Sequence, residues 1–381
     1  MRRSLASAVA VLLAGSIGST AIQAVDFATG RPGIRSMSAL AFGPDGVLFI
    51  GDGKGGAVFA IETGDRTERG ARDPITIEAI EEKVAALLGA TPEQVMIHDL
   101  AVNPISQNVY LAVSRGRGAW NSTWLLPNDI ADAGILLRVS SDKKITEVPL
   151  ESVRHARAAL PNPVDESKMH TWKKEISLRA DTITDMAFAG DVLYVAGLSN
   201  EEFASTMWKI PYPFKEGTTA TTLEMFHGAH GEYETNAPIR TFVPYRIKQD
   251  LHILAAYLCT PLVTFKESDL KQGIHLKGRT VGEFGSGNYP LDMVVYSKEG
   301  KERLLIANSN LPFMIVDPAE IERYDGSITE EVKGYTAGIP YEIRSGTGVL
   351  QMDSLNEEYI IALRRLPGGK MAMESLPVER F

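Results

Sequence analysis

One strand pattern recurs along the chain, and this repeat limits the possible folds more than any other feature. Residues 39–50 contain an apolar strand, a Pro-Asp-Gly turn and a second strand, and residues 57–61 add a third strand. Six copies of this meander are visible, and they begin at residues 39, 99, 185, 241, 292 and 348. A chain that repeats one small unit in this way builds an array of similar units.

The spacing of the copies favours a β-propeller. Successive copies begin 60, 86, 56, 51 and 56 residues apart, close to a propeller blade of roughly 40 to 50 residues with loop insertions. Each meander has an unpaired edge and an apolar face that it cannot bury alone, so the units pack radially around an axis. The sequence therefore predicts an all-β, six-bladed propeller. The 86-residue interval leaves a seventh blade as the alternative.

Two insertions interrupt the repeat, at about residues 70–96 and 141–180. In the first, four apolar residues recur at helical spacing: Ile77, Ile80, Val84 and Leu87. This spacing predicts a short helix after the first blade, capped by Thr76 and ended by Gly89, which either plugs one mouth of the channel or covers it as a lid. The second insertion is polar, and we expect a surface loop or an irregular blade there.

The N-terminal residues predict export. Arg2 and Arg3 precede the apolar run 5–18 and a small-residue stretch that ends at Ala24, which is the order of a secretory signal peptide. We expect residues 1–24 to be removed and 25–381 to form a single propeller domain in the periplasm or outside the cell. An uncleaved anchor is the alternative. No later segment has the roughly 18 apolar residues of a membrane span, so none is expected after cleavage.

Charge and cysteine content exclude several kinds of partner and cofactor. Loss of Arg2 and Arg3 takes the net charge from -9 to -11, and no run of Lys or Arg stands out, so we expect no nucleic-acid partner. Cys259 is the only cysteine, which excludes an internal disulfide and a covalently attached haem. Its apolar neighbours Leu258 and Leu262 predict a buried, inert thiol.

Three aspartates occupy the same position at the start of the innermost strand: Asp99, Asp185 and Asp292. These positions converge on one mouth of a propeller channel, where carboxylates suit calcium or magnesium. In the alternative, each aspartate accepts hydrogen bonds from backbone amides and fixes a turn between blades. Arg240 and Arg344 lie near the start of inner strands, where they would either meet an anionic ligand or pair with nearby aspartates.

The sequence of the first repeat resembles that of proteins in a known superfamily. Residues 42–52, Phe-Gly-Pro-Asp-Gly-Val-Leu-Phe-Ile-Gly-Asp, resemble the blades of exported NHL-repeat, gluconolactonase-like and quinoprotein-like propellers, with no specific family matched. The gluconolactonase-like resemblance implies a catalytic divalent cation and lactone hydrolysis. Ala39, Thr241 and Gly348 depart from that pattern, since they replace an aspartate in the other three repeats. The catalytic acid and asparagine of that family have no match.

A second candidate site lies in the polar segment 226–235. His227 and His230 stand three residues apart among glycines, and Glu232 and Glu234 follow them. Imidazoles with nearby carboxylates suit zinc, copper or iron, and His98 would supply a third nitrogen. In the alternative the pair binds no metal, because this spacing is common and lacks the H-E-x-x-H helix pattern.

These features leave two main functions open. The first is a binding protein that recognises a small molecule, a glycan or another exported protein at the channel mouth. The second is a metal-dependent enzyme, either a hydrolase with calcium at the aspartates or an oxidoreductase with zinc, copper or iron at the histidines. A structural module of the cell envelope is a third class. Motifs for a serine nucleophile elbow or a phosphate-binding loop are absent from the sequence.

Overall fold

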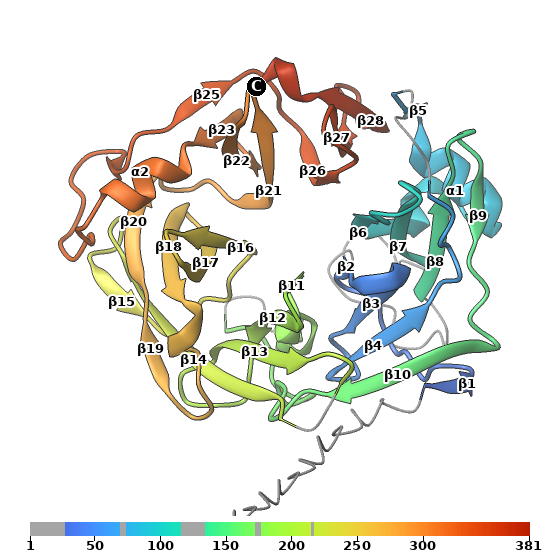
Figure 1. Cartoon of the computed structure of the whole chain (residues 1–381), viewed down its shortest axis with the longest axis horizontal. Coiled ribbons are helices and arrows are strands. Elements are labelled where there is room, and N and C mark those ends of the chain that lie inside the picture. The colour runs from blue at the N-terminus through green and yellow to red at the C-terminus, as the bar shows by residue number, and fades with distance from the viewer. Residues whose placement is uncertain (1–26, 69–73, 116–133, 172–176, 215–216) are drawn as a thin grey trace, which may run out of the picture.

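Six predominantly antiparallel sheets stand around a central axis in the computed structural model (Figure 1). The structure describes residues 27–68, 74–115, 134–171, 177–214 and 217–381. The all-β, six-bladed propeller predicted from the repeat is confirmed, and the predicted signal peptide lies outside the described residues. In that described part of the chain, neither helix is long and apolar enough to cross a lipid bilayer.

The innermost strand of each blade faces the axis, and blades are numbered one to six in sequence order. The inner strands are β2 (Leu40–Phe42), β6 (Val95–Val102), β11 (Asp185–Ala189), β16 (Thr241–Ile247), β21 (Pro290–Lys298) and β26 (Val349–Ser354). The middle strands are buried on both faces between neighbouring blades, which explains their continuous apolar runs. The sequence repeat therefore corresponds to the three strands nearest the axis.

The remaining strands complete each blade outward. Blade one has β3 (Val47–Asp52), β4 (Ala57–Glu62), β10 (Val153–Ala159) and β1 (Ala28–Gly30); blade two has β7 (Val109–Arg115), β8 (Gly134–Val139) and β9 (Ile145–Glu147). Blade three has β12 (Val192–Leu198), β13 (Ser205–Pro211), β14 (Thr219–His227) and β15 (Glu232–Glu234), with β19 (His275–Lys277) paired to β14. Blade four has β17 (Asp250–Ala256), β18 (Pro261–Lys266), β20 (Arg279–Glu283) and β24 (Ala337–Gly338). Blade five has β22 (Lys301–Asn308), β23 (Phe313–Val316) and β25 (Glu342–Arg344); blade six has β27 (Tyr359–Arg365), β28 (Met371–Pro377) and β5 (Thr76–Glu78).

The blades do not follow one another around the ring in sequence order. The inner strand β2 of blade one contacts β6 of blade two on one side and β11 of blade three on the other, while β6 also contacts β26 of blade six (Figure 1). The order around the ring is therefore two, one, three, four, five, six. The chain steps back from blade one to blade two and must then return past blade one.

The second insertion makes this return, and it is neither a free surface loop nor an irregular blade. Its strand β10 pairs with β4, with Ala158 opposite Val58, and so becomes an outer strand of blade one. The edge of β4 needs a partner because an open strand edge exposes unpaired backbone groups. The 86-residue interval thus contains part of blade one and no seventh blade among the described residues.

The predicted helix exists as α1 (Ile80–Leu88), after the first blade, and it ends at Gly89 in the left-handed conformation with φ 63°. Thr76 does not cap it, because Thr76 lies in β5, which closes the outer edge of blade six. Ile80 and Val84 pack into the core between blades two and six, and α1 contributes no residue to the central cavity. The helix is therefore neither a plug nor a lid. The other helix, α2 (Pro318–Arg323), follows blade five's strand β23.

Candidate functional site

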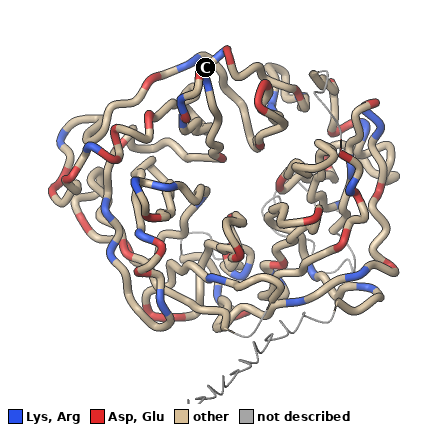
Figure 2. Tube along the Cα trace, viewed as in Figure 1, with Lys and Arg blue, Asp and Glu red and all other residues tan. Residues whose placement is uncertain are grey.

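The predicted aspartates gather around the axis. Asp99, Asp185 and Asp292 line a central cavity of about 370 Å³ together with a fourth carboxylate, Asp353, that the sequence repeat did not indicate. Figure 2 shows acidic positions at the inner ends of blades around this axis. Apolar side chains of the inner strands form the rest of the wall, including Phe42 and Phe242.

Each of these four carboxylates joins two neighbouring blades. One oxygen accepts the N–H of the next residue in the same strand, and the other accepts an N–H from the inner strand of the adjacent blade. The four contacts between blades run from Leu40 N to Asp99 Oδ2 (2.7 Å), Phe242 N to Asp185 Oδ2 (2.8 Å), Met352 N to Asp292 Oδ2 (2.7 Å) and Val102 N to Asp353 Oδ2 (2.7 Å). This arrangement agrees with the alternative in which the aspartates accept backbone amides, and we call the four residues the aspartate latches.

Burial shifts the protonation of the latches. It raises the pKa of Asp185 to about 7 and that of Asp353 to about 6. The pKa values of Asp99 and Asp292 are also raised well above the ordinary range, by burial first and by repulsion among the carboxylates second. The folded ring therefore holds protons on these groups at pH values where the unfolded chain has released them.

This proton binding predicts a pH dependence of stability. A carboxyl whose pKa rises on folding stabilises the folded state at low pH, and that contribution is lost as pH rises from about 4 through about 7. Asp185→Asn removes the titration, so the change in urea midpoint between about pH 5 and about pH 8 should become smaller than in the parent chain. An identical change in both proteins would contradict the raised pKa of Asp185.

The other predicted residues lie apart from one another. Arg240 pairs with Asp181 (3.5 Å), as in the alternative of pairing with a nearby aspartate, while Arg344 pairs with Glu342 on the outer strand β25 and does not line the cavity. His98 is on β6 in blade two, where its Nε2 contacts Ser114 Oγ (2.7 Å) and burial lowers its pKa to about 4. His98 is therefore not brought to His227 and His230.

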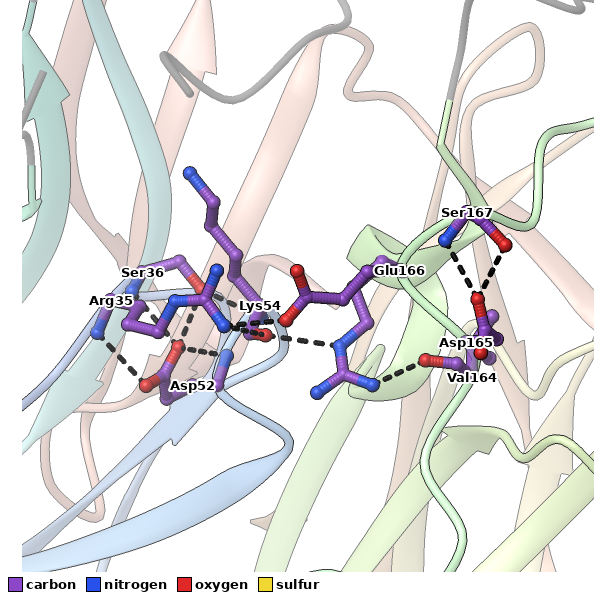
Figure 3. A network of polar contacts seen from close by, with 10 residues as sticks. Arg35, Ser36, Asp52, Lys54, Val164, Asp165, Glu166 and Ser167 are labelled. Atoms are coloured by element: carbon purple, nitrogen blue, oxygen red, sulfur yellow. Dashed lines mark hydrogen bonds and ion pairs between the residues drawn. The ribbon is translucent and has the colours of Figure 1, made fainter. Parts of the chain in front are cut away.

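A polar network near the glycine-rich turn between β3 and β4 is structural (Figure 3). The Asp52 carboxylate accepts the backbone N–H groups of Arg35 and Ser36, both at 2.9 Å. The Arg35 guanidinium in turn donates to Glu166 (2.6 Å) in the second insertion. These contacts fasten the returning insertion to blade one.

His227 and His230 do come together, at the rim between blades three and four. His227 ends β14, His230 lies in the turn that follows, and β15 returns antiparallel to β14. Gly228 is required in this turn, because an added Cβ would lie 2.7 Å from Val332 Cγ2 and 3.0 Å from Glu283 Oε1. A side chain at position 228 would therefore push the hairpin away from these neighbours.

A single carboxylate orients both imidazoles. Nδ1 of His227 and Nδ1 of His230 lie 2.7 and 2.6 Å from the same oxygen, Oε1 of Glu234, and the ring centroids are 3.8 Å apart. Burial acts to raise the pKa of Glu234, but the hydrogen bonds to the two histidines outweigh it and keep that pKa below the ordinary value. His227 is only 1% exposed, and its Nε2 has no hydrogen-bond partner among the described residues.

Cys259 completes this group, which we call the His-Cys cluster: His227, His230 and Cys259. A ring nitrogen of each histidine and the Cys259 sulfur all lie within 4.8 Å of one another. Cys259 lies in the turn between β17 and β18 and is only partly buried, so the expectation of a buried thiol is wrong, while its predicted inertness stays a prediction. In a propeller the end of an outer strand and the turn after the second strand lie on the same face, and this topology was the available signal.

A further buried polar atom near the cluster, Oε2 of Glu283, has no hydrogen-bond partner in the described part of the chain. The buried hydroxyls of Tyr257 and Ser205 lie next to each other. Glu283 is 2% exposed and its other oxygen accepts the Gly228 N–H (2.5 Å), while burial raises its pKa. Buried polar atoms are nearly always satisfied by protein, water or an ion. Oε2 of Glu283 is therefore available to a water molecule or an ion.

Comparison with known proteins identifies no family. The sequence matches no family model and no curated protein. Similar solved structures include a Thermus thermophilus protein whose name suggests an oxidoreductase of the glucose dehydrogenase type (12% identity, TM-score 0.34, 92% of this chain and 98% of that chain). Others are the extracellular region of plexin A4 (8%, 0.39, 93% and 47%) and a luciferin-regenerating enzyme (9%, 0.33, 91% and 92%). Similarities at this level assign no ligand or reaction to the chain.

Proposed function

We propose that the chain is an exported β-propeller protein that binds a transition-metal ion through the His-Cys cluster at the rim between blades three and four. The observation that carries the proposal is the convergence of a ring nitrogen of His227 and of His230 with the Cys259 sulfur. In addition, the buried Nε2 of His227 has no hydrogen-bond partner among the described residues. Imidazole nitrogen and thiolate sulfur are donors for zinc, copper and iron, and they are poor donors for calcium and magnesium.

The hydrogen bonds around the cluster support the same proposal. Metal-binding histidines commonly donate their second ring N–H to a carboxylate, which fixes the tautomer and the ring orientation. Glu234 has this position for both His227 and His230. By contrast, the oxygens of the aspartate latches already accept backbone N–H groups, which leaves a cation in the central cavity with less support.

Elemental analysis tests the proposal directly. Residues 25–381 would be purified without chelator, and the apo-protein would also be titrated with zinc and with copper. We expect about one ion per chain at saturation. The matched control for changes at the cluster histidines is His252→Ala, which should bind metal like the parent chain. His252 is on β17 of blade four, and its one hydrogen-bond contact among the described residues joins Nδ1 to the Asp250 carbonyl oxygen (3.2 Å). A chain that binds neither metal stoichiometrically would overturn the proposal.

Conservative changes at Glu234 and Glu232 distinguish the roles of these two carboxylates beside the cluster. Glu234→Gln keeps the size of the side chain but weakens the hold on both imidazoles, so metal affinity should fall about 10- to 100-fold. Glu232→Gln should leave the affinity nearly unchanged, since Glu232 is exposed and hydrogen-bonds neither ring among the described contacts. An equal loss in Glu232→Gln would instead place the ion at the group formed by His230, Glu232 and Glu234.

A further inference from the structure

The donor atoms of the His-Cys cluster discriminate among metals. Two imidazoles and one thiol converge, and thiolate sulfur is a soft ligand that favours copper and zinc. Among the divalent first-row metals, affinity for such sites rises to copper and falls again at zinc. The donor types therefore favour copper over zinc, and the number of protein donors is a second criterion.

The number of donors favours copper over structural zinc. A closed, structural zinc site uses four protein ligands, and an open, catalytic zinc site uses three. His227, His230 and Cys259 are three, so their number argues against structural zinc, and the order of affinities argues for copper over an open zinc site. Glu234 contacts Nδ1 of both rings and so positions them rather than completing the set. Two histidines and one cysteine form the equatorial ligands of copper electron-transfer centres. We infer that the cluster binds copper and exchanges single electrons, an inference that rests on the proposed function and extends it.

Contacts within the protein fix the backbone at Cys259 without help from an ion. Cys259 and Thr260 both have φ 63°, a conformation that is costly for a β-branched residue and is kept only when neighbours impose it. The Cys259 N–H donates to Asn288 O (2.8 Å), and the Thr260 hydroxyl donates to Gly285 O (2.9 Å). A site fixed by such contacts changes little when the charge of the ion changes, which suits electron transfer.

One edge of the cluster is exposed, so a redox partner can approach it closely. The His230 side chain is 47% exposed, and Leu258 beside Cys259 is also exposed, while His227 is buried. In the proposed step Cu(II) would gain one electron from a small organic reductant such as ascorbate and become Cu(I), and the reductant would lose that electron. Both imidazoles and the thiolate stay bound, so no proton moves and no bond to the protein breaks.

Spectroscopy of the copper-loaded chain tests the inference. Residues 25–381, stripped of metal, would receive one equivalent of Cu(II). We expect an intense visible absorption from charge transfer between the Cys259 thiolate and Cu(II), removed by ascorbate and restored by ferricyanide over repeated cycles. In an equimolar mixture of Cu(II) and Zn(II), copper should be the ion retained.

Two variants make the result specific. Cys259→Ser should abolish the absorption band and weaken copper binding at least about 100-fold, whereas His252→Ala should match the parent chain. Copper bound without the band, a thiol consumed by the first addition of Cu(II), or zinc retained over copper would each overturn the inference and leave metal binding intact. Binding of neither ion would overturn the inference and the proposed function together.

Discussion

The double variant His227→Ala, His230→Ala is expected to lose stoichiometric metal binding while the propeller stays folded. Both changes remove nitrogen donors, and the remaining Cys259 thiol alone cannot chelate an ion. We expect the Kd for copper or zinc to rise at least about 1000-fold, which corresponds to about 4 kcal/mol. Isothermal titration of the apo-protein measures the change, and the increase in Tm that metal gives the parent chain should disappear with it.

Folding of this variant needs a separate check, because His227 is buried and its removal leaves space at the rim. The single change His230→Ala avoids this difficulty, since His230 is 47% exposed and should be replaceable without loss of stability. It should nevertheless weaken binding strongly. If His230→Ala binds metal as tightly as the parent chain, the ion is not held by the His-Cys cluster.

The sequence predicted which segments form blades, but it did not predict the order of the blades around the ring. A repeat of apolar strands shows which segments form similar sheets, because alternation and turn residues are local properties. The pairing of β10 with β4 joins residues about a hundred positions apart, such as Ala158 and Val58. Nothing local in β10 specifies that partner, so the second insertion was expected to be a loop or an irregular blade and the order of the blades in the ring could not be predicted.

The candidate site also has a part that local sequence predicts and a part that depends on contacts between blades. The pair His227 and His230 was recognisable because one short turn holds both imidazoles. Cys259 reaches them from the next blade through a turn with positive φ, and its apolar sequence neighbours suggested burial instead. Asp353 was missed because it stands five residues after Gly348, the start of its repeat, whereas the three predicted aspartates stand at the start of theirs.

Removal of one aspartate latch should cause the largest loss of stability among single changes at the axis. In Asp292→Ala, the N–H groups of Met293 in blade five and Met352 in blade six both lose their acceptor. An unsatisfied buried N–H costs about 1–3 kcal/mol, so the free energy of unfolding should fall by about 2–6 kcal/mol. Urea denaturation measures this change as a lower midpoint at an unchanged m-value.

The matched control is Asp191→Ala, because Asp191 is exposed at the turn between β11 and β12 and has no hydrogen bond from its side chain among the described contacts. Its effect should stay within about 0.5 kcal/mol. In Asp292→Ala, water in the central cavity could accept the two N–H groups in place of the carboxylate. The size of the stability loss therefore shows whether the carboxylate itself is needed. A loss no larger than in Asp191→Ala would mean that water replaces the carboxylate, and the aspartates would then be available to a ligand rather than required for joining the blades.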